Sequence, residues 1–117
     1  MYKRGDREFV LDMLFACNKI MNYTKGLTYE DFKKNEMVID AVTRNIEILG
    51  EASKSISDGL KNKYPEVGWK EIARTRDKII HFYFGINLEI IWDIVIEDIP
   101  KLKTELEKII KLEGWSL

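Results

Sequence analysis

Apolar residues recur every three or four positions along almost the whole chain, and no stretch alternates between apolar and polar residues for more than a few positions. Spacing of this kind places the apolar side chains on one face of an α-helix, whereas a half-buried strand requires alternation. The chain is therefore predicted to be all-α. The spacing is most regular in a set that we call the C-terminal seam, where the intervals are 4, 3, 4, 3, 4 and 3: Leu88, Trp92, Val95, Ile99, Leu102, Leu106 and Ile109.

Interruptions of this spacing divide the chain into helices. Gly26 can take the left-handed conformation that ends a first helix. Thr28 and Asp31 have the spacing of a capping box for a second helix, and Asn87 is a good N-cap for the last one. Pro100 lies inside the seam without changing its phase, which predicts a kinked C-terminal helix rather than two separate ones. We expect helices at residues 6–23, 29–34, 35–60, 68–82 and 87–112.

A chain of 117 residues, 45% of them apolar, is long enough to bury a core of its own. We therefore expect a single domain over residues 1–117, folded as an up-and-down bundle of four to five helices. The C-terminal seam has two interpretations. Packing within the bundle is the ordinary role of such a stripe, while a heptad spacing also fits association with a second copy of the chain.

Composition excludes several classes of function. Nineteen basic residues face twenty acidic ones, and this net charge of −1 excludes a protein that coats nucleic acid through its overall charge. Cys17 is the only cysteine and His81 the only histidine, which excludes an intrachain disulfide and the usual zinc sites. Neither a signal peptide nor a membrane-spanning stretch is visible. We expect a cytoplasmic protein that needs no metal or other cofactor.

The residues that carry the most chemistry lie in one segment, residues 74–83. It contains three cations, the only histidine and a tyrosine: Arg74, Arg76, Lys78, His81 and Tyr83. Asp77 lies four residues before His81, one helical turn away, and could accept a hydrogen bond from the imidazole and stabilise its protonated form. Arg76 lies five residues before His81, about 140° around a helix. These two side chains converge only if the helix loosens near its end or a second chain completes the site.

A purely structural interpretation of this segment stays open. A single histidine near the C-terminus of a helix is commonly a cap or a surface residue. The three cations can form an ordinary solvated helix face. Tyr83 fits the core at a corner between two helices. In this interpretation the chain is a bundle whose seam only dimerises.

The segment resembles the R-x(4)-H-x-Y motif of the HepT-like toxins in the HEPN superfamily, with Arg76, His81 and Tyr83 at the three fixed positions. Neighbouring blocks are similar as well. Trp69 and Ile72 precede the motif, and further blocks follow it at residues 86–87, 92–94 and 99–102. Upstream, the family's second-helix block is similar to residues 44–45 and 49–52. The ordered set of blocks covers nearly the whole chain.

This resemblance implies an all-α bundle that forms a homodimer and acts as a metal-independent ribonuclease. Such toxins are usually encoded beside a minimal nucleotidyltransferase that serves as their antitoxin. The resemblance implies that Arg76 and His81 are the catalytic pair, and that Tyr83 is the residue which the partner enzyme adenylylates. Four further residues are candidates to support the site or line its cleft: Asp77, Arg44, Asn45 and Glu51.

The chemistry of RNA cleavage suits these residue types. Without a metal ion, the ribose 2′-hydroxyl must be activated, the phosphorane charge stabilised and the leaving oxygen protonated. A histidine that titrates near neutral pH can exchange the protons, and an arginine matches phosphate geometry while staying charged. Since one histidine cannot readily be both acid and base in one step, the single His81 favours a dimer with two copies in one cleft.

The competing hypothesis is a non-catalytic helical partner or regulatory subunit of a nucleotidyltransferase. It uses the same fold and the same polar segment. The near-neutral net charge favours it, because binding to free RNA usually needs more positive charge.

Overall fold

The computed structural model describes residues 4–81 and 87–115. For residues 80 and 81 it describes only the backbone. Within these ranges every regular element is helical, which confirms the all-α prediction. None of the described helices is long and apolar enough to cross a membrane. The elements are α1 (Asp6–Thr24), α2 (Tyr29–Lys33), α3 (Glu36–Ser55), α4 (Asp58–Lys63), α5 (Trp69–His81), α6 (Leu88–Asp93), a π-helical segment η2 (Ile94–Asp98) and α7 (Ile99–Glu113).

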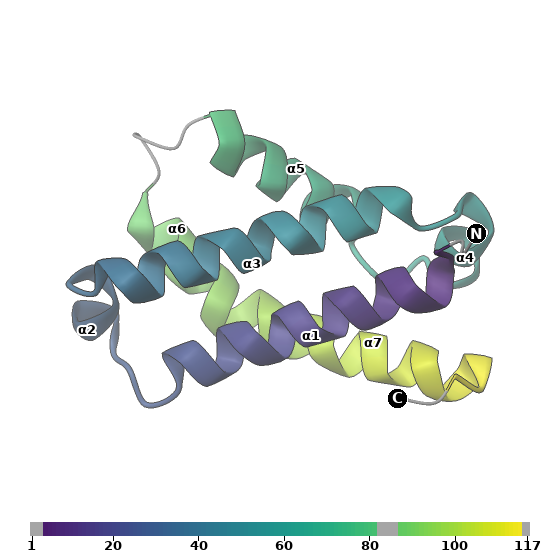
Figure 1. Ribbon diagram of the computed structural model, residues 1–117, viewed down its shortest axis with the longest axis horizontal. Coiled ribbons are helices and arrows are strands. Elements are labelled where there is room, and N and C mark those ends of the chain that lie inside the picture. The colour runs from purple at the N-terminus through teal and green to yellow at the C-terminus, as the bar shows by residue number, and fades with distance from the viewer. Residues whose placement is uncertain (1–3, 82–86, 116–117) are drawn as a thin grey trace.

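The long helices pack as an up-and-down bundle. α3 lies between α1 and α5, and α7 packs along α1 (Figure 1). The short helix α2 packs against α3 and α6 at one end of the bundle, and α4 lies at the other end. Because α5 packs chiefly on α3 and diverges from it toward its C-terminal end, α5 forms an edge of the molecule.

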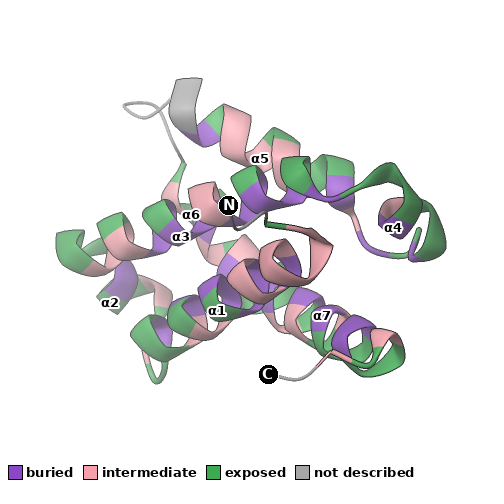
Figure 2. Ribbon diagram, turned by 45° about the vertical axis from the view of Figure 1, so that its right-hand side comes forward, coloured by how far each residue is buried: buried purple, intermediate pink, exposed green. Residues whose placement is uncertain are grey.

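One apolar core joins the long helices, and Figure 2 shows their buried faces turned toward one another. Leu88 and Trp92 of the seam are partly buried against this core, with the Trp92 ring 5.1 Å from that of Phe32. The rest of the seam is fully inside it: Val95, Ile99, Leu102, Leu106 and Ile109. The prediction that the seam packs within the bundle is therefore confirmed.

The last helix changes its hydrogen bonding just before Pro100. α6, η2 and α7 follow one another without a gap, and the N–H of Ile99 donates to the carbonyl of Ile94, five residues earlier. A proline has no N–H, and its ring crowds the carbonyl four residues before it. The wider π turn relieves that crowding. One distorted helix is thus confirmed, as opposed to two separate ones.

The predicted helix over residues 35–60 is wrong in its last part. α3 ends five residues earlier, Ile56 is extended with φ −67° and ψ 138°, and Ser57 caps the separate helix α4. The apolar spacing conceals the break, because Ile56 and Leu60 stay four residues apart and both remain buried. Asp6 at the start of α1 accepts hydrogen bonds from the N–H and the hydroxyl of Ser57. No local pattern reveals this contact, since it joins residues 51 positions apart.

Three predicted boundary features are confirmed. Gly26 has a φ of +76° after α1. Thr28 and Asp31 form both hydrogen bonds of the capping box, each at 3.1 Å. Asn87 caps α6 by accepting from the N–H of Glu89 at 2.8 Å. The last position of the helix expected at residues 68–82 lies outside the described residues.

Candidate functional site

α5, which carries the polar segment, rests antiparallel on α3. The hydroxyl of Ser53 donates to the carbonyl of Trp69 at 3.0 Å near the start of α5, and Gly50 meets Arg76 further along. A methyl group added at Gly50 would lie 2.6 Å from Cγ of Arg76 and closer still to its Cβ. Only glycine therefore allows α5 to approach α3 this closely with Arg76 at the crossing. This explains why a glycine stands in the middle of α3, although glycine destabilises a helix interior by ~0.5–1 kcal/mol relative to alanine.

Four charged side chains lie where the two helices meet, and we call them the charge cluster: Glu51, Lys54, Arg76 and Asp77. Nη2 of Arg76 donates to Oε1 of Glu51 at 3.1 Å, and Nη1 of Arg76 donates to Oδ1 of Asp77 at 3.2 Å. Nζ of Lys54 donates to the same Oδ1 at 2.7 Å. One carboxylate oxygen of Asp77 thus joins two cations, one from each helix.

Hydrogen bonding favours the ionised forms of Asp77 and Arg76. Bonds from Lys54 and then from Arg76 lower the pKa of Asp77. The bond to Asp77, with a further contribution from Glu51, raises the pKa of Arg76 against the opposing effect of desolvation. Two cations and two carboxylates leave the cluster without net charge. Arg76 is its least exposed member, with 24% of the side chain accessible, so packing as well as pairing fixes the guanidinium.

The other two residues of the motif are located less fully. His81 is the last residue of α5, and its backbone is described but its side chain is not. Tyr83 lies outside the described residues. The hydrogen bond expected between Asp77 and His81 therefore stays a prediction. Oδ1 of Asp77 is already bonded to Lys54 and Arg76, so such a bond would use Oδ2.

Of the α3 residues predicted to line the cleft, Glu51 alone reaches Arg76 within the described part of the chain. Arg44 is exposed and pairs with Glu47 at 3.4 Å. Asn45 is buried, and its amide donates at 2.8 Å to a carbonyl one turn earlier in α3. Its Oδ1 has no hydrogen-bond partner among the residues that are described. The fold thus does not bring Arg44 and Asn45 into the charge cluster.

Sequence reasoning missed Lys54 and Gly50. Lys54 lies three residues after Glu51, on nearly the same face of a helix, and this spacing could have indicated it. A glycine inside a helical pattern could have indicated the close approach of another element. Neither feature identifies the partner helix, because Lys54 meets Asp77 23 positions away and Gly50 meets Arg76 26 positions away.

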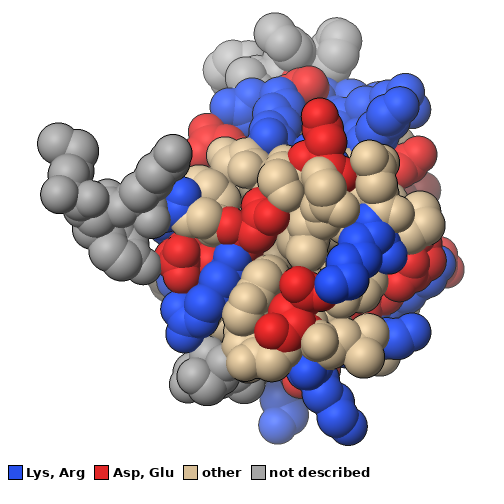
Figure 3. Space-filling view, turned by 90° about the vertical axis from the view of Figure 1, so that its right-hand side faces the viewer, with Lys and Arg blue, Asp and Glu red and all other residues tan. Residues whose placement is uncertain are grey.

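α5 makes this edge of the molecule basic. It contains four basic and two acidic residues, although the whole chain has one acidic residue more than it has basic ones. Figure 3 shows Lys and Arg side chains gathered at the upper edge of the molecule, where α5 lies in Figure 1. Basic and acidic side chains are mixed over the rest of that face. In a nearly neutral chain, a local basic edge is the electrostatic footprint expected for contact with RNA.

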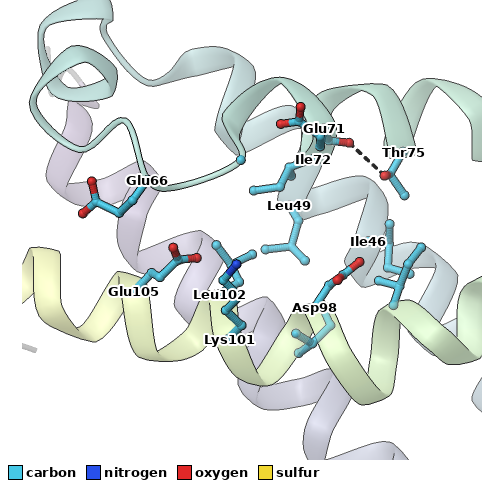
Figure 4. A pocket seen from close by; sticks show the side chains of 13 residues that line it. Ile46, Leu49, Glu66, Glu71, Ile72, Thr75, Asp98, Lys101, Leu102 and Glu105 are labelled. Atoms are coloured by element: carbon cyan, nitrogen blue, oxygen red, sulfur yellow. Dashed lines mark hydrogen bonds between the residues drawn. The ribbon is translucent and has the colours of Figure 1, made fainter.

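A pocket of about 340 Å³ opens between α3, α5 and α7, and none of the charge-cluster residues lines it. Figure 4 shows its apolar floor, which includes Ile46, Leu49, Ile72 and Leu102. Its rim carries four carboxylates and one lysine: Glu66, Glu71, Asp98, Glu105 and Lys101. Desolvation raises the pKa of Glu105, with Lys101 acting in the opposite direction. Because an acidic rim repels phosphate, this pocket does not suit an RNA strand.

Groups that could bind a metal or act as a thiol nucleophile are not assembled in the described part of the chain. No set of three or more His, Cys, Asp or Glu side chains lies close enough together there to hold a metal ion. Cys17 is buried in the core, and desolvation raises the pKa of its thiol to about 12. The thiol therefore stays protonated and is not available as a nucleophile.

Comparison with known proteins gives one family match and several close relatives. The family described as Ribonuclease HepT-like matches residues 13–109. A Methanocaldococcus jannaschii protein named as a candidate RNase is 47% identical over 115 residues, which cover 97% of this chain and 95% of that protein. A Thermococcus cleftensis protein named probable ribonuclease HepT is 42% identical over 109 residues, which cover 93% of this chain and 99% of that protein.

Another M. jannaschii relative has a name that joins a gamma-glutamylcyclotransferase to a candidate RNase. It is 46% identical over 99 residues, which cover 85% of this chain and 45% of that longer protein. No solved structure matches the chain.

Proposed function

We propose, from the premise that this chain belongs to the HepT-like ribonuclease family, that it cuts RNA at the edge formed by α5 and needs no metal ion. The observation that carries the proposal is the placement of Arg76, the first residue of the motif. It is packed on Gly50, hydrogen-bonded to two carboxylates and held as a permanent cation at a basic edge. His81, the second residue of the motif, ends the same helix.

In the proposed reaction, the 2′-oxygen of a ribose attacks the adjacent phosphorus while the bond from phosphorus to the next 5′-oxygen breaks. One imidazole takes the proton of the 2′-hydroxyl, and a second gives a proton to the leaving 5′-oxygen. The products are a 2′,3′-cyclic phosphate and a free 5′-hydroxyl. Proton transfer of this kind contributes typically ~10²–10⁴-fold. Arg76 stabilises the charge that develops on the phosphorane oxygens, because a guanidinium stays ionised and matches phosphate geometry.

The active form is proposed to be a homodimer, since the reaction uses two imidazoles and each chain has one histidine. A two-fold axis would place two copies of Arg76 and His81 around one cleft. Mixing wild-type and His81→Ala chains tests this arrangement. If both imidazoles are needed, a mixture of equal amounts of the two chains should have about a quarter of the activity that wild type shows at the same total protein concentration. Only dimers of two wild-type chains are then active, and random pairing makes them about a quarter of all dimers. Retention of about half, or a strict monomer in light scattering at micromolar concentration, would contradict the shared cleft.

The proposed partner is a minimal nucleotidyltransferase that silences the ribonuclease, as an antitoxin would, by modifying Tyr83 in the cytoplasm. Transfer of AMP from ATP to the phenol oxygen, with release of pyrophosphate, would add a phosphate and a purine two residues after His81. The added phosphate would pair with the cations that RNA needs.

Intact mass spectrometry after incubation with ATP and the nucleotidyltransferase encoded beside this chain tests the modification. Tyr83→Phe is the matched control, because it keeps the ring and loses the acceptor oxygen. We expect added AMP on the wild type alone, and a Tyr83→Phe variant that still cuts RNA yet resists silencing. Equal addition to both proteins would remove Tyr83 from this role.

A second candidate function is a non-catalytic partner or regulatory subunit of such a nucleotidyltransferase. The neutrality of the charge cluster favours it, since both cations are already paired with carboxylates and RNA would have to compete with them. RNA cleavage by the purified chain separates the two functions. Wild type should cut a mixture of labelled RNAs, and His81→Ala, checked for equal helix content, should not. Absence of cutting by wild type, or equal cutting by the variant, would reject the ribonuclease and leave the second candidate.

A further inference from the structure

Lys54 is the one cation of the charge cluster that does not belong to the R-x(4)-H-x-Y motif. It comes from α3, while Arg76 comes from α5, and both donate to the same oxygen, Oδ1 of Asp77, at 2.7 and 3.2 Å. Two nitrogens at these distances from one atom lie no more than about 6 Å apart. That spacing lets both cations bond to the oxygens of a single phosphate group.

We propose that Lys54 and Arg76 together bind one phosphate of the RNA backbone, and that Asp77 holds the two cations at the required spacing when no RNA is bound. The inference rests on the proposed ribonuclease function and adds a phosphate-binding residue to it. Oδ1 of Asp77 occupies, between the two cations, the place that a phosphate oxygen takes when RNA binds.

Both cations have donors left for a second acceptor. A guanidinium carries five N–H groups and an ammonium three. In the charge cluster Nη1 and Nη2 of Arg76 make one hydrogen bond each, and Nζ of Lys54 makes one. The two side chains also differ in position. Arg76 is 24% exposed and fixed against α3, whereas Lys54 is 44% exposed and lies on the solvent side, where a strand can reach it.

The carboxylates of the charge cluster should oppose RNA binding, whereas the two cations should favour it. The charges of the cluster cancel, so an incoming phosphate meets two negative groups as well as two positive ones. Removing the charge of Asp77 should therefore strengthen RNA binding, while removing the charge of Lys54 should weaken it. A salt bridge that served only the fold would respond alike to the loss of either partner, and would not alter RNA binding.

The test measures the affinity of the full chain for single-stranded RNA of random sequence in which every 2′-hydroxyl is methylated, so that the strand cannot be cut. Fluorescence anisotropy over a range of salt concentrations gives the affinity and its salt dependence. For Lys54→Gln we expect about three- to tenfold weaker binding and a log–log salt slope that is shallower by at most about 0.7, the value for one whole phosphate contact, because Arg76 still contacts the shared phosphate. Lys54→Arg should restore most of the binding.

Two further variants complete the test. Asp77→Asn, which keeps the shape of the side chain, should bind RNA more tightly than wild type. Lys19→Gln is the matched control, because Lys19 is an exposed lysine on α1, which packs on α3 separately from α5. It should leave affinity and slope unchanged.

An unchanged affinity and slope in Lys54→Gln would overturn the inference, and so would equal weakening by Lys54→Gln and Asp77→Asn. In either case cleavage by wild type and its loss in His81→Ala would leave the ribonuclease proposal standing. If wild type neither binds nor cuts RNA, the proposed function itself fails and the inference fails with it.

Discussion

α7 and α5 are both amphipathic helices packed against a longer helix, but they use opposite kinds of contact. α7 packs along α1 and buries its part of the seam almost completely, with Leu106 at 0% and Ile109 at 1% exposure. α5 meets α3 at Gly50, and the side chains around that crossing are charged and partly exposed.

This difference separates residues that hold the fold from residues that do not. Full burial of a Leu or Ile side chain stabilises a protein by ~1.5–3 kcal/mol. Pairs between exposed charges typically add only ~0–1 kcal/mol. The polar residues of α5 are therefore poorly explained by stability, and a function at the α3–α5 edge explains them better.

The largest expected effect is on catalysis, when the motif residues of α5 are replaced. Arg76→Ala and His81→Ala should each lower the rate of RNA cleavage by ~10²–10⁴-fold, since each removes a group that we propose to act in the transition state. The melting temperature of Arg76→Ala should change little, because Arg76 pairs with partly exposed carboxylates and lies outside the apolar core. Cleavage assays and thermal melts on the same preparations check both expectations. A variant that cuts at the wild-type rate would remove its residue from the site.

The next largest expected effect is on stability, when a buried residue of α7 is truncated. Leu106→Ala should lower the free energy of unfolding by ~2–5 kcal/mol, because it leaves a cavity in the core. Leu112→Ala in the same helix is the control, since Leu112 is 61% exposed and should change stability by less than ~0.5 kcal/mol. Urea unfolding measures both. Similar losses in the two variants would show that the seam does not hold the bundle as described.

Gly50→Ala should affect both properties, because it forces the two helices apart at Arg76. We expect a loss of ~1–3 kcal/mol in unfolding free energy, as for other overpacked sites, together with slower cleavage. Gly59→Ala in α4 is the control, since the atom nearest to its added Cβ is Oγ of Ser57 at 3.8 Å. Unfolding and cleavage assays on the pair decide the matter, and equal behaviour of the two variants would argue against a tight α3–α5 crossing.

The smallest effect is on the pH dependence of stability. The pKa of Asp77 is lowered in the folded protein, so its pairing stabilises the fold at pH values above the ordinary aspartate pKa of 3.8 and is lost as pH falls through the lowered value. Wild type should therefore melt slightly higher than Asp77→Asn at neutral pH, and the difference should vanish in acid. Thermal melts from pH 7 to below the ordinary pKa measure it. A difference that grows in acid would contradict the pairing.

Much of the fold follows from the sequence because apolar spacing decides which face of a helix is buried. The seam, the Thr28–Asp31 capping box and the Asn87 cap are local features, and all three are present in the structure. The break after α3 is not local. Ile56 and Leu60 keep a helical spacing across it, and the cap of α4 is completed by Asp6 from the far end of the chain.

The candidate site follows from the sequence only in part. The motif locates Arg76, but the pairing of Arg76 with Glu51 and of Asp77 with Lys54 depends on the crossing of α3 and α5, which helical spacing within one segment does not reveal. Two other polar residues of α3 miss the cluster for different reasons. Arg44, seven residues before Glu51, is on nearly the same face but about 10 Å further along the helix, where it pairs with Glu47. Asn45 is turned by about 120° from Glu51 and is buried.

The most direct test of metal-free cleavage at α5 is the rate at which one labelled RNA is cut in the presence of EDTA, by wild type and by His81→Ala. We expect the wild-type rate to be unaffected by EDTA, the 5′ fragment to end in a 2′,3′-cyclic phosphate by mass, and the variant to cut at least ~100-fold more slowly. If EDTA stops the wild-type reaction and added Mg²⁺ restores it, or if His81→Ala makes the same product at the same rate, metal-free cleavage by Arg76 and His81 is contradicted.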